Sequence, residues 1–195
     1  MTNPWDKPPI PKLGDDSEDI TYAGVGRVMS AWEQVEIELG FTYGQFLKRS
    51  DHRNAIREYG QGRIFSERLS ILTRASDIHF RRYPNQDEEG AFLMLRKAIE
   101  GFSGRRNDVA HGIVRTFLLT QKEDDATPRH MSFLMPAYYD PRRFDADTNA
   151  PAYSYSSVEL NALAEGLSEL HFKARLFRLS VRKEIAVRWS RSKRT

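Results

Sequence analysis

The sequence predicts a mainly α-helical bundle, with a small β-hairpin inserted before a long C-terminal helix. Four segments carry apolar residues at three- to five-residue steps, the spacing of amphipathic helices. Two short apolar runs after the third segment are typical of strands. The hydrophobic content of 39% and the charged content of 29% suit a globular protein in water. We therefore expect a leader over residues 1–17 and a single helical domain over 18–195, with the β insertion at about 115–156.

The first seventeen residues are expected to form an extended, mobile leader, because they hold four of the nine prolines. They lack the apolar core of a secretory signal. No apolar run elsewhere approaches the length needed to cross a bilayer. The chain has no cysteine, which excludes disulfides, thiolate zinc sites and a cysteine nucleophile. By default we expect a cytoplasmic protein that needs no membrane, metal or cofactor.

The first two helical segments are each expected to end at a glycine. A long helix over 19–39 is predicted to end at Gly40, with a short helical segment over 42–48 after it. A short helix over 51–58 should end before Gly60.

Two further long helices should follow. One runs from Ile64 to Tyr83, since the residue before a proline avoids the helical region. The next covers 88–100. The Gly-Phe-Ser-Gly sequence over 101–104 is expected to end it, so that a separate short helix begins near Ser103.

Two apolar runs, over 116–120 and 131–135, predict the strands of a hairpin. The aromatic segments 138–144 and 153–155 could extend this sheet or lie as ordered coil on the bundle. A capping-box sequence over 156–159 then begins the final helix, whose apolar stripe reaches about Trp189.

Arg106, Asn107 and Asp108 are expected in the first turn of the short helix, with His111 one turn further on. Free backbone N–H groups and the helix dipole favour anions at such a position, so the cluster suits a phosphate. Asn107 and His111 are four residues apart and share a helix face. Arg106, five residues from His111, would be badly placed on an ideal helix, although a first-turn position allows another direction.

These residue types suit the cleavage of RNA without a metal. The 2′-hydroxyl can attack the neighbouring phosphorus if a base that titrates near neutral pH takes its proton, and histidine is the residue of that kind. His111 would be this acid/base, and Arg106 would stabilise the charged transition state through bidentate donors. Asn107 would orient them, with Asp108 as a supporting residue. The products would end in a 2′,3′-cyclic phosphate and a 5′-hydroxyl.

The sequence Arg106-Asn-Asp-Val-Ala-His-Gly112 resembles the Arg-Asn-x-x-x-His signature of HEPN-domain ribonucleases. The resemblance extends over most of 19–190. It implies a helical bundle, a two-fold dimer, and either metal-independent RNA cleavage or a catalytically inactive RNA-binding or dimerisation module. A dimer could face two motifs across a cleft and so provide one histidine as base and one as acid. The resemblance also suggests a toxin or phage-defence role with a possible antitoxin or regulatory partner. Some members carry a modified tyrosine where this chain has Ile113, which argues against that style of control.

Several other residues keep two interpretations. Glu36 could be a buried partner of Arg106 or His111, or a partly exposed acid that pairs with another arginine. Arg105 and Arg115 could bind RNA phosphates or be surface residues without a role. Residues 171–195 hold nine Lys or Arg and one acid, a run that attracts polyanions or simply solvates a helix face. Five aromatic residues after the hairpin could stack on bases or pack against the bundle: Tyr138, Tyr139, Phe144, Tyr153 and Tyr155.

Overall fold

The structure is a computed structural model that describes residues 3–49, 51–119 and 128–192, apart from the side chains of Leu119 and of residues 183–192. The chain divides into two compact units. Unit 1 comprises residues 1–32 and 101–167, and unit 2 comprises residues 33–100 and 168–195. Each unit is built from segments that lie far apart in the sequence.

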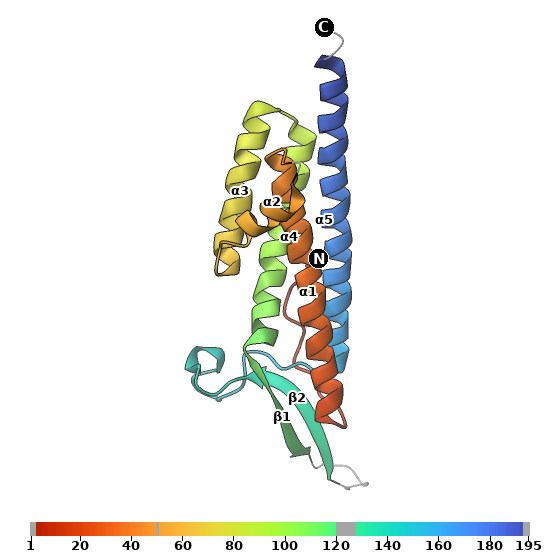
Figure 1. Ribbon diagram of the computed structural model, residues 1–195. Coiled ribbons are helices and arrows are strands. Elements are labelled where there is room, and N and C mark those ends of the chain that lie inside the picture. Colours follow the sequence, from red (N-terminus) through yellow and green to blue (C-terminus); the bar gives the residue numbers. More distant parts are fainter. Residues whose placement is uncertain (1–2, 50, 120–127, 193–195) are drawn as a thin grey trace. The chain divides into compact units, whose positions relative to one another are not determined.

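The predicted fold class is confirmed. The described residues form five α-helices, a short 3-10 helix η1 and one two-stranded antiparallel sheet (Figure 1). None of the described helices is long and apolar enough to span a membrane. The elements in chain order are α1 Glu18–Phe46, α2 His52–Tyr59, α3 Phe65–Arg82, α4 Gln86–Ala110, β1 Gly112–Leu119, β2 Arg129–Pro136, η1 Pro141–Arg143 and α5 Ser157–Ser192.

Two of the helix ends expected at glycines are wrong. Helix α1 continues through Gly40 and Gly44, and α4 continues through Gly101 and Gly104, so no separate helix begins near Ser103. A glycine inside a helix costs about 1 kcal/mol relative to alanine, which close packing can offset. Gly44 and Gly101 allow such packing, whereas a Cβ atom at Gly104 would meet no neighbour within 4 Å. A Cβ atom at Gly44 would lie 2.9 Å from the Ala55 side chain, and one at Gly101 would collide with the indole ring of Trp5.

The described part of the leader, residues 3–17, belongs to unit 1 and makes contacts within it. Asp15 and Ser132 of β2 exchange backbone hydrogen bonds of 2.9 and 2.8 Å. The ring of Trp5 lies edge-on to Phe102, with 5.9 Å between the ring centroids. The segment 3–17 is therefore held at two points.

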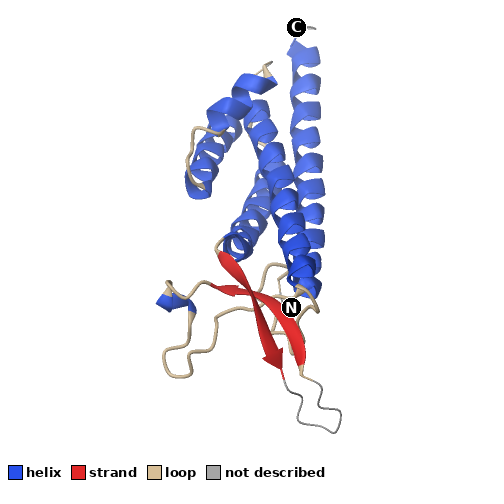
Figure 2. Ribbon diagram, turned by 60° about the horizontal axis from the view of Figure 1, so that its bottom comes forward, coloured by secondary structure: helices blue, strands red, loops and turns tan. Residues whose placement is uncertain are grey.

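The hairpin is confirmed, and its register runs from Gly112 opposite Pro136 to Leu119 opposite Arg129. Tyr155 extends the sheet by one bridge, since it exchanges backbone hydrogen bonds of 2.8 and 2.9 Å with Leu134. The rest of the segment after β2 is a loop that contains η1, beside the hairpin in Figure 2. The segment around Tyr155 therefore extends the sheet, and the segment 138–144 is mainly ordered coil.

The predicted capping box at the start of α5 is also confirmed. The backbone N–H of Ser156 donates to the Glu159 carboxylate at 2.8 Å, and the Ser156 hydroxyl accepts from the N–H of Val158 at 3.2 Å. The buried Asp15 carboxylate adds to this cap, because it accepts from the backbone N–H of Ser157 at 2.9 Å. Three backbone N–H groups at the start of the helix are thus satisfied by side chains.

Unit 2 has an aromatic core. The ring of Phe46 at the end of α1 lies 5.7 Å from Phe80 of α3, 5.3 Å from Phe92 of α4 and 6.1 Å from Phe177 of α5. These residues are at most 8% exposed. The predicted apolar stripes of these four helices therefore meet in this unit, around a cluster of large rings.

Candidate functional site

The motif lies at the C-terminal end of α4. Arg106, Asn107 and Asp108 belong to its last turns, and His111 is the one residue between Ala110 and the start of β1. The expected phosphate cradle at a helix start is therefore wrong. The free backbone groups at a helix C-terminus are carbonyls, and the dipole there disfavours anions. Any phosphate at this place must be bound by side chains.

Asn107 connects the other two motif residues. Both Asn107 and His111 are exposed, and the backbone N–H of His111 donates to the Asn107 carbonyl at 3.1 Å. The half-buried guanidinium of Arg106 lies 5.7 Å from the ring centroid of Trp32, and its Nη1 donates to Asn107 Oδ1 at 3.2 Å. On a regular helix, side chains five residues apart, such as those of Arg106 and His111, project in directions that differ by about 140°. The structure thus brings the arginine to the amide, and places the amide on the helix face of His111.

His111 lines a pocket of about 190 Å³. The other lining residues are Ala137, Tyr139, Asp140 and Arg143, all from the loop after β2. Asp140 and Arg143 are site residues that the motif does not predict. Their one signal in the sequence is the Tyr-Tyr-Asp-Pro-Arg-Arg segment over 138–143, which places charged groups next to aromatic residues.

Arginines hold Asp140 in this pocket. Its Oδ1 accepts from Arg142 Nε at 3.0 Å, and its Oδ2 accepts from Arg143 Nε at 3.1 Å. The hydrogen bond from Arg142, followed by its charge and the contact with Arg143, holds the pKa of Asp140 below its ordinary value. The carboxylate is therefore ionised at neutral pH.

Asp108 is the buried centre of a network below the pocket. Its carboxylate lies 2.9 Å from Arg105 Nη1 and 3.3 Å from Arg143 Nη1, and it accepts from the Tyr155 hydroxyl at 3.1 Å. Its backbone carbonyl accepts from the Tyr153 hydroxyl at 2.9 Å. Asp108 therefore holds Arg143 at the pocket. Arg105, expected as an RNA-binding candidate, is a partner of this buried carboxylate with 16% of its side chain exposed.

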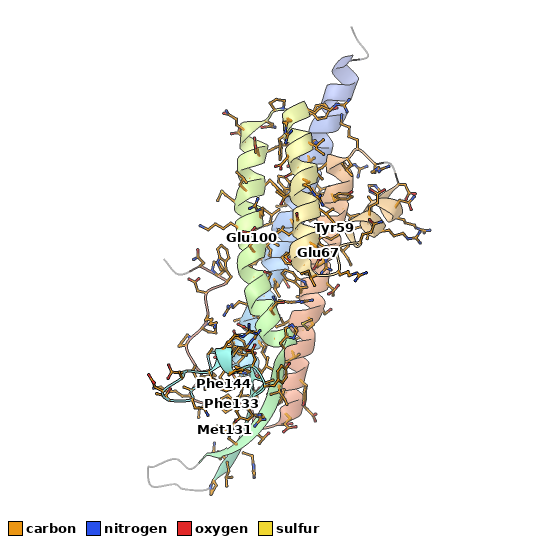
Figure 3. The ribbon with its side chains drawn as sticks, turned by 90° about the vertical axis from the view of Figure 1, so that its left-hand side faces the viewer. Tyr59, Glu67, Glu100, Met131, Phe133 and Phe144 are labelled. Atoms are coloured by element: carbon orange, nitrogen blue, oxygen red, sulfur yellow. The ribbon has the colours of Figure 1, made fainter. Side chains whose placement is uncertain are left out.

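Arg115 of β1 contacts the loop through the ring of Tyr138. The Arg115 guanidinium lies 3.8 Å from the Tyr138 ring centroid, and that ring stacks on Phe144 at 5.4 Å. Figure 3 shows Phe144 in this loop. Tyr138 and Tyr139 are 55% and 81% exposed. Tyr153 and Tyr155 are buried, so packing is the correct interpretation for them.

Glu36 fits neither of its two interpretations completely. It is buried, but it pairs with an arginine other than Arg106. In unit 2 its carboxylate accepts from Arg68 Nη2 at 2.7 Å and from the Tyr59 hydroxyl at 2.9 Å (Figure 3 labels Tyr59). This glutamate therefore has a structural role in the core of unit 2.

Two further features concern the possible metal sites and the basic residues near the C-terminus. Among the described residues, no group of three or more His, Asp or Glu side chains could hold a metal ion. The side chains of the last five basic residues of the C-terminal run, from Lys183 onward, lie outside the described part of the chain. Within the described part, Arg178 pairs with Glu38 of unit 2 at 2.7 Å.

Comparisons of the chain with models of protein families, with curated proteins and with solved structures found no match. The function is therefore argued from the motif and the chemistry of its surroundings.

The buried Tyr155 should make the protein sensitive to alkali. Burial, and next the Asp108 carboxylate, raise the pKa of Tyr155 well above its ordinary value. The unfolded chain releases this proton near pH 10 and the folded chain retains it, so the free energy of unfolding falls as pH rises above about 10, by up to about 1.4 kcal/mol per pH unit. Tyr155→Phe should reduce that slope by up to this amount in urea unfolding at a series of alkaline pH values.

The exposed Tyr139→Phe is the matched control for this measurement and should leave the slope unchanged. Equal slopes for the wild type and Tyr155→Phe would show that Tyr155 ionises without unfolding.

Proposed function

We propose that this protein is a HEPN-type endoribonuclease that cleaves RNA without a metal ion. The observation that supports this most is the exposed His111, on one helix face with Asn107 and beside a pocket that holds a guanidinium. An exposed imidazole can take the proton of a 2′-hydroxyl and return one to the leaving 5′-oxygen. The chemistry needs a base at the 2′-oxygen, an acid at the 5′-oxygen and fixed positive charge near the phosphate.

The positive charge would come from arginine side chains, because the end of α4 presents carbonyls. Arg106 is the principal candidate. Its cation–π contact with Trp32 and its hydrogen bond to Asn107 restrict the guanidinium in advance, so that less side-chain freedom is lost when a phosphate binds. Asn107 would then orient the guanidinium and the substrate on the His111 face.

The proposal includes a two-fold dimer. Each chain has a single motif histidine, whereas the reaction uses a base at the 2′-oxygen and an acid at the 5′-oxygen. A second chain would supply the second histidine. It would also supply a second Arg106, which could approach the phosphate from a direction that Arg106 of the first chain cannot reach from α4. Control by an antitoxin or regulatory partner, in a toxin or phage-defence role, rests on the family resemblance alone.

The test is cleavage of a single-stranded RNA in the presence of EDTA, followed by analysis of the product ends. We expect fragments with 2′,3′-cyclic phosphate and 5′-hydroxyl ends, and no cleavage where a 2′-deoxynucleotide replaces the attacked ribose. Loss of activity in EDTA with recovery in Mg²⁺, or products with 3′-hydroxyl ends, would contradict the proposal.

A catalytically inactive RNA-binding module is the second candidate function. The exposed Tyr138 beside Arg115, together with the exposed Tyr139, favours it, because aromatic rings and guanidinium groups bind single-stranded RNA without any need for cleavage. A gel shift with intact RNA, unchanged in His111→Ala, would support this module over the nuclease.

A further inference from the structure

We infer that the pocket beside His111 binds one unpaired guanine base of the RNA, with Asp140 accepting hydrogen bonds from its N1–H and N2–H groups. The inference rests on the proposed function, since it gives that site its substrate preference. It follows from the chemistry of four residues that line the pocket: His111, Tyr139, Asp140 and Arg143.

The pocket is suited to a base and unsuited to a phosphate. Asp140 is an ionised carboxylate at the pocket wall, and it would repel a phosphate oxygen. A volume of about 190 Å³ is below the roughly 300–1,000 Å³ of pockets for drug-sized ligands, so it suits a single planar ring system. The phosphate would then remain outside, next to His111 and Asn107.

The carboxylate distinguishes guanine from the other bases. An ionised carboxylate only accepts hydrogen bonds. Guanine presents two adjacent donors, N1–H and N2–H, on its Watson–Crick edge, which fit the two oxygens of one carboxylate. Adenine and cytosine place an acceptor nitrogen beside their amino group, and uracil flanks its single N–H with two carbonyls. Each of these three would set a lone pair against Asp140.

Asp140 has capacity for these bonds. A carboxylate offers about four acceptor positions, and three hydrogen bonds from Arg142 and Arg143 occupy it. Arg142 is 88% exposed, so its contact with Asp140 exchanges readily with water and contributes little stability. A guanine edge can replace the Arg142 contact at small cost.

Arg143 and Tyr139 complete the recognition. Arg143 is held by Asp108 at 3.3 Å, by Asp140 at 3.1 Å and by the Tyr153 hydroxyl at 3.3 Å, which leaves a quarter of its side chain exposed as a donor for guanine O6 or N7. Tyr139, at 81% exposure, offers its ring face for stacking. A base can reach such a site only when it is unpaired, so the pocket also selects single-stranded RNA.

The test measures binding without cleavage. Fluorescence anisotropy would compare the wild-type affinity for short 2′-O-methyl oligouridines that carry one central guanine, adenine, cytosine or uracil. These strands lack the attacking hydroxyl and stay intact. We expect the guanine strand to bind at least about tenfold more tightly than the other three. Asp140→Asn should remove this preference, since its amide presents a donor to guanine. The matched control Asp147→Asn, an exposed acid of the same loop outside the pocket lining, should keep it.

A change in the ligand tests the same contact in wild-type protein. Inosine lacks the N2 amino group, so its strand should bind several-fold more weakly than the guanine strand. This measurement needs no variant and stands even if Asp140→Asn fails to fold.

Equal affinity for all four strands, or a guanine preference that survives in folded Asp140→Asn, would overturn the inference. RNA cleavage without a guanine preference would leave the nuclease intact and end the guanine assignment, whereas a guanine preference without cleavage would keep the pocket and end the nuclease.

Discussion

His111→Ala is expected to abolish RNA cleavage, with a loss of about 10²–10⁴-fold in rate, and to leave the fold unchanged. This is the loss expected when a general acid/base is removed, because the alanine side chain cannot accept or donate a proton. The fold should persist because the His111 side chain is exposed. The measurement is the cleavage rate of a labelled RNA in EDTA, together with the circular dichroism spectrum of each variant.

The control for this prediction is His130→Ala, which removes another exposed histidine, on β2. It should cleave RNA at the wild-type rate. A His111→Ala variant that keeps more than about a tenth of the activity would remove the histidine from the proposed mechanism.

Arg106→Ala should also abolish cleavage if its guanidinium stabilises the transition state, and Arg106→Lys should recover little of it, because lysine lacks the planar pair of donors. Recovery of full activity with lysine would show that only a positive charge is needed there. Both variants require the same spectroscopic check, since Arg106 packs on the buried Trp32.

Asp108→Ala is expected to lower the free energy of unfolding by about 3–5 kcal/mol, the usual cost of breaking a buried ion pair from one side. The change leaves the guanidinium groups of Arg105 and Arg143 without their carboxylate, and the Tyr155 hydroxyl without its acceptor. Chemical unfolding followed by circular dichroism would measure the difference.

Glu100→Ala is the matched comparison on the same helix. Glu100 pairs with Arg96 at 3.0 Å, but its side chain is 47% exposed, so its loss should cost less than about 1 kcal/mol. Figure 3 labels Glu100 on α4. Similar destabilisation by Asp108→Ala and Glu100→Ala would show that the Asp108 network contributes no more than a surface pair.

The helices and the hairpin could be predicted from the sequence because their signals are local. Apolar periodicity located α3 within about a residue, and the Ser156 to Glu159 pattern located the start of α5. The errors came from glycines that were interpreted as helix ends. Whether Gly101 ends a helix or accommodates a neighbour depends on Trp5, almost a hundred residues earlier, and no local pattern contains that contact.

The candidate site was predictable only in part, for the same physical reason. The motif residues are close in sequence, so their grouping was visible, but their position at a helix end or start depended on the mistaken break at Gly101. The network of Asp108 with Arg143 and Tyr155 joins residues 35 and 47 positions apart. Nothing in the sequence near either partner indicates such pairing.

The junction between α4 and β1 bears on how the site could operate. Because His111 stands alone between a helix and a paired strand, its backbone is anchored on both sides, and its ring can turn only about its own side-chain bonds. A loop movement therefore cannot bring His111 to a bound substrate. In the proposed reaction, the RNA strand would have to bend to present its sugar to a stationary imidazole, and flexible stretches of RNA would be cleaved in preference to stiff ones.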